Sequence, residues 1–496
     1  MIYSAFRKRF FVLLFGSFCA ANASVLDLTL EDAVRTALEQ NAQLKIGATA
    51  LQIAQAQYLQ AKSAEYPSLD LSLSAYRMDE DINTKAEGAF VLSQDFTNQL
   101  ALSAADLQDE IVSIQTGIDS HTNLVQMLQL VQKGAVPAQS VPFDMDIKIL
   151  GKKMAAAELA LSYPIYTGGK ISAIIKQASL NRKVKSEALR RSRSQVIYDT
   201  KKYYYAAILA EKIRKETEVT LERLKLVRDL TEAFYKGDSL KVKKTDYLRT
   251  LLTVNLATSM YEQAKSAEKT AKAALINAMG LPWNTEIRVV QKEFAKPSDD
   301  VALNALIEDA YRFNPEYGQL RLAIDISDAR IDESSSGYLP SIGFQANAKH
   351  FYNSFDGGYN TTQNRNSWTI GVGLKWNLFN GFLDREKIEQ AKLEKRTLRQ
   401  KEVVLKEGLA LQVKAAFLAF DSALRQYRAL SGALENAVEN ADLNIRAYRA
   451  DMVSTKDVIE AQLMEAFTKT AYYKSQHDYS ANRALLEYIV TSSVEE

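Results

Sequence analysis

The chain consists of two similar halves, and this internal repeat limits what it can fold into. A segment near the N-terminus matches one past the middle of the chain at a constant offset of 273 residues, which pairs Asn41 with Asn314 and Pro67 with Pro340. A second match has an offset of 213 residues, and a third has an offset of 211. Three long registers in the same order predict two tandem structural repeats.

The offsets also give the domain boundaries. We expect a signal peptide at 1–23, a first repeat at 24–280, a linker at 281–301 and a second repeat at 302–496. The first repeat is longer because it carries an inserted segment at about 78–154. The insertion contains apolar residues at helical spacing: Leu100, Ala104, Leu107, Ile111, Ile114 and Ile118.

The N-terminus has the pattern of a secretory signal peptide. Three basic residues at 7–9 precede an apolar run at 10–20, and Ala21-Asn22-Ala23 forms a small-residue cleavage site. The apolar run is too short to span a bilayer as a helix. The one cysteine, Cys19, lies in the segment to be removed, so the mature chain is expected to have neither disulfides nor thiolate chemistry. A buried N-terminal helix is the alternative.

Composition argues against several function classes. The chain has 62 Lys and Arg, three of them in the signal peptide, against 60 Asp and Glu, so the mature chain is nearly neutral and nucleic acid is not an expected partner. His121, His350 and His477 match no metal-ligand spacing. No phosphate-binding loop, dinucleotide-binding loop or nucleophile motif occurs. We therefore expect no enzyme, no catalytic residue, no metal and no cofactor.

Each repeat contains two segments in which apolar and polar residues alternate. One face of the clearest segment carries Trp368, Ile370, Val372, Leu374, Trp376 and Leu378. Matching apolar faces begin at Leu69, Leu159 and Ile342. A period of two suits strands of a membrane barrel with lipid outside and water inside, and the two tryptophans suit interface anchors. A soluble antiparallel sheet has the same alternation and is the alternative.

The strands lead into very long helices. Residues 170–235 contain neither proline nor glycine, and 66 helical residues span about 100 Å. In the second repeat apolar or aromatic residues recur every seven positions: Val413, Phe420, Tyr427, Leu434, Ala441 and Tyr448. A second heptad position carries Ala416, Ala423, Leu430, Ala437 and Asn444. This pattern predicts a coiled-coil seam. A coiled coil of the cytoskeletal type explains neither the strands nor the signal peptide.

Four strands per chain are too few to close a membrane barrel. Open strand edges cannot face lipid, and bacterial barrels have at least eight strands. Two chains would supply eight strands and three chains would supply twelve. An eight-stranded barrel is filled by its own side chains, so a hollow duct favours three chains.

On these residues the chain resembles the TolC-like outer-membrane efflux family. The resemblance covers nearly all of the mature chain, including a strand-to-helix junction at Pro164, Gly168, Gly169 and Gly381 and a second hairpin turn at 448–461. It implies an α+β membrane protein. Its trimeric 12-stranded outer-membrane β-barrel, with four strands per chain, would be continuous with a long α-helical coiled-coil barrel in the periplasm.

The same resemblance implies a passive exit duct of a tripartite efflux or type I secretion system. A periplasmic adaptor protein and an inner-membrane pump would supply substrate to the homotrimer, which would sit in outer-membrane lipid. The alternative is a periplasmic coiled-coil structural protein without a membrane barrel, and the alternating strands argue against it.

The resemblance places a periplasmic gate at the hairpin turns. Asp457 and Glu460 share a helix face, and three-fold symmetry would stack them into two acidic rings that favour cations and raise at least one carboxyl pKa. Alternatively, both are solvated near a helix start, where carboxylates favourably meet the helix dipole. Tyr448 and Asp246 match gate positions, and a hydrogen bond between them would hold neighbouring hairpins shut. Val453 stands where the family has a gate arginine.

The first hairpin turn is longer than the second and is rich in lysine. It carries Lys236, Lys241, Lys243 and Lys244, which are candidates for docking the adaptor. A solvated charged turn is the alternative.

Overall fold

The computed structural model describes residues 25–91, 140–237, 242–290, 294, 302–357, 365–450 and 452–491. The expected signal peptide, the helically spaced residues 100–118 of the insertion and Lys241 lie outside the described residues. The chain divides into two compact units. We call them the helical unit (Met1–Tyr58, Gln177–Asp328 and Lys392–Glu496) and the sheet unit (Leu59–Lys176 and Ala329–Ala391).

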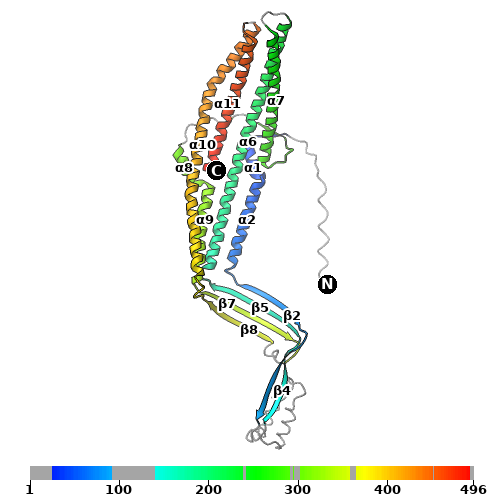
Figure 1. Cartoon of the computed structure of the whole chain (residues 1–496), viewed down its shortest axis with the longest axis vertical. Coiled ribbons are helices and arrows are strands. Elements are labelled where there is room, and N and C mark those ends of the chain that lie inside the picture. The colour runs from blue at the N-terminus through cyan, green and yellow to red at the C-terminus, as the bar shows by residue number, and fades with distance from the viewer. Residues whose placement is uncertain are drawn as a thin grey trace. The chain divides into compact units, whose positions relative to one another are not determined.

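In each half the elements follow the predicted order of helix, strand, strand, long helix, turn and helix (Figure 1). The first half contains α1 (Leu30–Gln40), α2 (Ala42–Ser63), β2 (Ser68–Arg77), β5 (Lys153–Tyr166), α6 (Lys170–Lys236) and α7 (Lys244–Met279). The second contains α8 (Leu303–Phe313), α9 (Pro315–Ser335), β7 (Ser341–Asn353), β8 (Asn366–Lys375), α10 (Leu383–Arg449) and α11 (Thr455–Val490). Among the described helices, none is both long and apolar enough to cross a membrane.

The sheet unit contains a four-stranded antiparallel sheet in the order β2-β5-β7-β8. Its register aligns the predicted apolar faces: one row across the four strands is Leu71, Leu159, Ala348 and Trp368. The next row, on the other face, is Asp70, Ala160, Asn347 and Thr369, with a 2.6 Å hydrogen bond from Thr369 Oγ1 to Asn347 Oδ1. A slip of one residue would exchange the faces, so side-chain chemistry fixes the register.

The inserted segment begins and ends in a second antiparallel pair, β3 (Ile82–Val91) with β4 (Ser140–Leu150). Its base is tied to the end of β7 by Asn353, which is buried. The Asn353 amide accepts from the Gly151 N–H at 2.7 Å and donates to the Gly151 carbonyl at 3.0 Å. Asp81 adds an ion pair with Lys148. The insertion therefore leaves the sheet through an ordered junction.

In the helical unit, the predicted coiled-coil seam of α10 is confirmed. Val413, Phe420, Ala441 and Tyr448 are buried, and the intervening heptad positions are half-buried. Part of this seam forms an apolar core with Tyr479 and Leu486 of α11 and with α8. A corresponding core joins α1, α6 and α7 to β1 (Leu26–Leu28) and β6 (Ile287–Val289), which pair in parallel.

Asn41 and Asn314, which the sequence repeat pairs, make the same contacts in the two halves. The Asn41 side chain accepts from the Gln43 N–H and donates to the Ala278 carbonyl at 2.9 Å. The Asn314 side chain accepts from the Glu316 N–H and donates to the Ile489 carbonyl at 3.0 Å. The Asn41 bond places the start of α2 against the end of α7.

Candidate functional site

The start of α11 carries Asp457, one of the two expected gate acids. Its carboxylate accepts hydrogen bonds from the Ser454 N–H at 3.0 Å and the Ser454 hydroxyl at 2.7 Å, and Ser454 Oγ accepts from the Asp457 N–H in return. This reciprocal pair caps the helix. The Ser454 hydroxyl is the main reason why the pKa of Asp457 lies below its ordinary value. The rise in a carboxyl pKa that we expect from acidic rings requires the carboxylates of neighbouring chains, so it stays a prediction.

Asp246 has an equivalent position at the start of α7. Its carboxylate accepts from the Lys243 N–H at 3.0 Å and lies 3.4 Å from the Arg249 guanidinium. Asp246 and Asp457 are therefore both in the first turn of a helix that leaves a hairpin turn. For Asp457, which is exposed, this agrees with the solvated helix-start interpretation, whereas the Asp246 side chain is only 22% exposed.

Tyr448 is buried beneath the second turn. Its hydroxyl hydrogen-bonds to Thr231 Oγ1 at 2.7 Å and to Thr455 Oγ1 at 3.0 Å, which connects α10 to both α6 and α11. Its ring lies in an apolar cluster with Val227, Val458 and Ile459, against which Val453 packs. Within the described chain Tyr448 thus holds the two hairpins together. The expected bond to Asp246 stays a prediction for the assembled state.

Glu460, the other expected gate acid, lies in a groove between α7 and α11. The groove is lined by Arg249, Lys456, Ile459, Glu460, Leu463, Met464 and Phe467. Two cations, Arg249 and Lys456, therefore share the groove with Glu460. Because Arg249 comes from α7 and Lys456 from α11, the groove also places the two hairpin turns beside each other.

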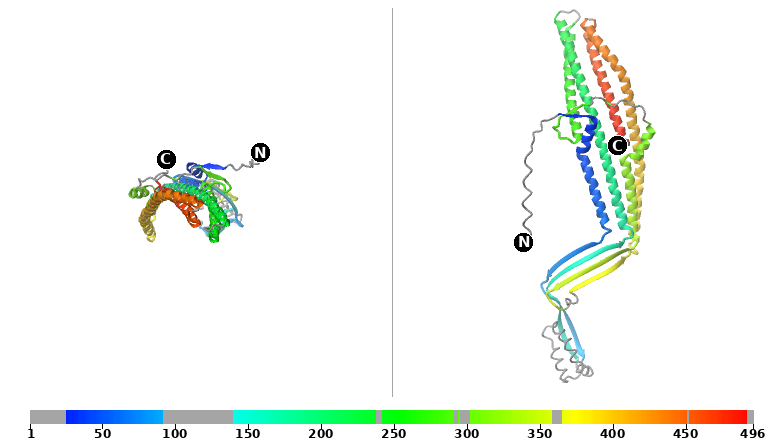
Figure 2. Two further views of the ribbon diagram at one scale, coloured as in Figure 1. Left: turned by 90° about the horizontal axis from the view of Figure 1, so that it is seen from above. Right: turned by 180° about the vertical axis from the view of Figure 1, so that it is seen from behind.

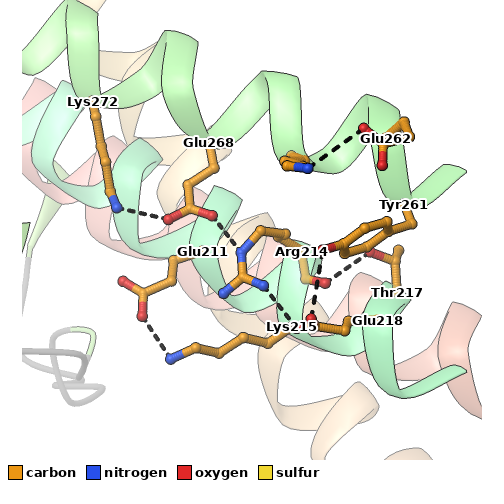
Figure 3. Close-up of polar contacts among 10 residues, drawn as sticks. Glu211, Arg214, Lys215, Thr217, Glu218, Tyr261, Glu262, Glu268 and Lys272 are labelled. Carbon is orange, nitrogen blue, oxygen red and sulfur yellow. Dashed lines mark hydrogen bonds and ion pairs between the residues drawn. The ribbon is translucent and has the colours of Figure 1, made fainter. Parts of the chain in front are cut away.

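A charged network joins α6 to α7 within the first hairpin (Figure 3). The Arg214 guanidinium contacts Glu268 at 2.5 Å and Glu218 at 2.8 Å, and Lys272 contacts Glu268 at 2.7 Å. Burial raises the pKa of Glu268, but the ion pairs with Lys272 and Arg214 outweigh it and leave the pKa below its usual value. The first hairpin is therefore held by ionised groups as well as by apolar packing.

A second network joins the two hairpins and was not predicted. The Glu465 side chain of α11 is 2% exposed and contacts Arg223 of α6 at 2.6 Å and Lys469 at 2.7 Å. Lys469 also contacts Glu216 of α6 at 3.1 Å. One feature of the sequence indicated this network. Glu465 follows the buried Val458 by seven residues, so it lies on the apolar face of α11, where a charged residue needs a partner.

The lysines of the first turn differ in their surroundings. Lys236 contacts Glu232 at 2.6 Å, and this hydrogen bond raises the Lys236 pKa. Lys243 and Lys244 are exposed, and Lys241 lies outside the described residues. Lys243 and Lys244 are therefore the more accessible candidates for docking.

The strand-to-helix junctions in the sheet unit use glycines in left-handed backbone conformations. The φ angles are +64° at Gly168, +85° at Gly169 and +65° at Gly381, a region that disfavours residues with a Cβ atom. At Gly168 an added Cβ would also lie 2.8 Å from Leu339 Cβ. Near Pro164 the register between β5 and β7 shifts by one residue. The junction therefore needs glycine for backbone geometry.

The described residues contain no group of three or more His, Cys, Asp or Glu side chains placed to hold a metal ion. Two features of the described residues are candidates for function: the exposed apolar face of the sheet, and the acidic and basic residues of the hairpin turns.

Residues 306–489 match the family model described as outer membrane efflux protein. Two curated relatives are the alkaline protease secretion protein AprF of Pseudomonas aeruginosa and the outer membrane protein TolC of Vibrio cholerae. AprF is 25% identical over 140 residues, which are 28% of this chain and 29% of AprF. TolC is 28% identical over 172 residues, which are 34% of this chain and 35% of TolC. The matched segments thus span about a third of these relatives.

Solved structures extend the similarity over the whole fold. A membrane protein from Pseudomonas aeruginosa has a TM-score of 0.68 at 16% identity, covering 93% of both chains. The outer membrane protein VceC from Vibrio cholerae has a TM-score of 0.65 at 12% identity, covering 93% of this chain and 95% of VceC. The predicted resemblance is thus confirmed in sequence and fold. The names of the family model, of these two relatives and of VceC, which are those of outer-membrane or secretion proteins, agree with the expected location, the outer membrane with a helical part in the periplasm.

Proposed function

We propose that this chain, which carries an outer membrane efflux protein domain, is the exit duct of a tripartite efflux or type I secretion system and works as a homotrimer. One observation carries the proposal: the sheet has a continuous apolar face that is open to its surroundings. Leu71 is 65% exposed, Val372 65% and Trp368 75%. Water disfavours so large an apolar patch, whereas lipid would cover it.

The position of the tryptophans supports a place in a bilayer. Trp368 lies in β8, and Trp376 directly follows its last residue. The two are eight residues apart, about 26 Å at the rise of an extended strand, which is of the same order as the ~25 Å apolar band between the aromatic girdles of outer-membrane barrels. The opposite face carries Ser162, Gln345, Asn347, Lys349 and Thr369, which suit a water-filled lumen. The alternative, a periplasmic coiled-coil protein, gives the apolar face no partner.

Three chains would supply the twelve strands that close a hollow barrel. In this proposal the barrel conducts passively, and a periplasmic adaptor and an inner-membrane pump deliver the cargo. The absence of catalytic motifs in the sequence is consistent with transport energy that comes from the pump.

We further propose that Asp457 and Glu460 form the periplasmic gate and make it selective for cations. Asp246 and Tyr448 would hold the hairpin turns of neighbouring chains together at this gate. In planar bilayers the wild type should prefer cations and be blocked by multivalent cations from the side of the helices. Changing Asp457→Asn with Glu460→Gln should weaken block about tenfold or more, because stacked rings of charge are removed. The amide oxygen of the first substitution can still accept the hydrogen bonds that cap α11, so the helix start should be preserved.

A matched control for this test is Glu439→Gln with Asp442→Asn, two exposed acids that are also three residues apart, on α10. This control should leave selectivity and block as in the wild type. If the gate variant and the control variant show the same selectivity and block, the gate lies elsewhere in the channel, and the proposed exit duct is not contradicted.

Adaptor docking on the first turn is the remaining part of the proposal. Lys243→Glu with Lys244→Glu should lower export without lowering the amount of assembled channel, because the change reverses charge on an exposed turn. Lys265→Glu with Lys269→Glu, exposed on the same helix, is the control. Export at the wild-type level in the turn variant would mean that these lysines only solvate the turn.

A further inference from the structure

The apolar face of the sheet ends in two basic residues, Arg77 of β2 and Lys153 of β5. They are the last pair in the register of these two strands, and they lie on the same face as Leu71 and Leu159. Both are exposed. Among the described strand positions on this face, they are the only Asp, Glu, Lys or Arg residues. The charge of this face is therefore positive and gathered at one end.

This end of the sheet is the one remote from the helices that adjoin it. β2 begins shortly after α2, and β5 leads directly into α6, so the last residue of β2 and the first residue of β5 lie at the opposite end. Figure 2 shows the four strands side by side, with β2 (blue) at one edge. In the proposed duct, whose helices are in the periplasm, Arg77 and Lys153 would therefore lie at the outer surface of the membrane.

The spacing along β5 places Lys153 at the boundary of a bilayer. Tyr163 and Lys153 are ten residues apart, about 33 Å along the strand, which corresponds to about 25 Å of depth at a strand tilt of about 40°. This depth equals the height of the apolar band of an outer-membrane barrel. Tyr352 is 52% exposed and lies opposite Ala155, one row inside Lys153, where an aromatic girdle is expected. Lys153 and Arg77 therefore reach the level of the lipid headgroups.

Arg77 and Lys153 lie directly opposite each other in the register, although like charges in this arrangement are destabilising. No ion pair joins either of them to another described residue. The pair thus has an unfavourable interaction within the chain that no described contact offsets. A bound anion would offset it.

The carboxylates that follow β2 do not supply this anion. Asp81 contacts the Lys148 ammonium at 2.5 Å and accepts a hydrogen bond from the Lys152 N–H at 2.7 Å. Asp79 accepts from the Glu80 N–H at 3.0 Å, and both side chains are exposed in the turn. An anion from outside the chain is therefore the better partner for the two cations.

We propose that Arg77 and Lys153 together bind a phosphate group of a phosphorylated lipid in the outer leaflet of the membrane. Directly opposite side chains have Cβ atoms about 5 Å apart, so both cations can reach one phosphate. Arginine offers two parallel N–H donors to phosphate oxygens, and lysine adds a second positive charge. Inward from the pair this face carries Ala75, Ala155 and Ala157, against which the acyl chains of the same lipid would lie. The inference rests on the proposed membrane duct and names a lipid that it binds.

The test compares the wild type with Arg77→Gln plus Lys153→Gln, each purified in a mild detergent and titrated with lipid A, a glycolipid that carries two phosphates. Native mass spectrometry should show one bound lipid per chain in the wild type. The affinity of the variant should be about tenfold or more lower, because the charge-assisted hydrogen bonds to the phosphate are lost.

Thermal unfolding separates a loss of binding from a loss of folding. Lipid A should raise the unfolding midpoint of the wild type and leave that of the variant unchanged, since a ligand stabilises the state that it binds. Without lipid the variant should be at least as stable as the wild type, because the substitutions remove a repulsive pair.

Lys349→Gln with Lys375→Gln is the matched control, because it removes two exposed basic residues from the opposite face of the sheet. This control should bind lipid A as the wild type does. Two further probes distinguish a lipid from a free anion. Inorganic phosphate at the same concentration should not displace lipid A from the wild type, and lipid A stripped of its phosphates should bind about tenfold more weakly or less.

Equal affinity of the wild type and the Arg77 and Lys153 variant for lipid A would overturn the inference. Displacement by inorganic phosphate, or undiminished binding of the stripped lipid, would overturn it as well. A trimer that resists extraction by salt but fails these tests leaves the proposed duct intact. A protein that salt releases from the membrane overturns both proposals.

Discussion

Val372→Arg is expected to abolish assembly of the protein in the outer membrane. Val372 lies mid-strand on the apolar face, opposite Phe344 of β7, and is 65% exposed. Arginine on the lipid side of a barrel costs about 2–4 kcal/mol near the bilayer midplane, and a trimer would carry three copies. The measurement is the fraction of chain that resists extraction by salt and migrates as a folded oligomer in unheated gels.

Gly371→Arg is the matched control. Gly371 is the adjacent residue on the opposite face of the same strand, and no atom lies within 4 Å of its Cβ position. A lumen filled with water should accept the arginine, so this variant should assemble nearly as the wild type does. Equal assembly of the two variants would show that the apolar face does not contact lipid.

Lys469→Met should destabilise the helical unit by about 3 kcal/mol. Lys469 lies between Glu465, which is 2% exposed, and Glu216, and removing one partner of a buried ion pair typically costs 3–5 kcal/mol because it leaves an uncompensated charge. Arg223 still contacts Glu465, which favours the lower end of that range. The measurement is the free energy of unfolding in urea.

Lys474→Met provides the comparison, because Lys474 pairs with Asp478 on the exposed side of the same helix, and such pairs contribute about 0–1 kcal/mol.

The network around Lys469 also predicts that stability depends on pH. Burial lowers the pKa of Lys469, but hydrogen bonds to Glu465 and Glu216 raise it above its ordinary value of 10.5. The extra stability is therefore present below pH 10.5 and is lost as the pH rises beyond it. The prediction would be contradicted if, above pH 10.5, the free energy of unfolding of the wild type fell no faster with rising pH than that of Lys469→Met.

Periodic patterns predicted the fold well. The strand faces followed from alternation, because in a regular antiparallel register every second residue of β5, β7 and β8 shares a side. The α10 seam followed from its seven-residue spacing, because each heptad position of a long helix falls on one line. In both cases the spacing of apolar residues along the sequence equals the repeat of the strand or helix, so a short stretch of sequence is enough to predict which side chains share a face.

Contacts between distant residues could not be predicted in this way. β1 and β6 are three residues each and pair across more than 250 residues, so neither has a period to detect. β3 has no clean alternation and forms against β4, where the Phe143 ring covers Gly88. The sequence placed Asp246 and Asp457 at the hairpin turns, and the structure has them in the first turns of α7 and α11. The bond from Tyr448 to Thr231 could not be predicted, because it joins two long helices and depends on their packing.

The central claim is that three copies of this chain form a duct in the outer membrane. Its most direct test is the mass of the protein that a mild detergent extracts from outer membranes after a high-salt wash. We predict that the salt wash leaves the protein in the membrane and that the extracted particle contains three chains of equal mass. A protein that the salt wash releases, or that is a monomer or dimer in detergent while still conducting ions, would contradict the account.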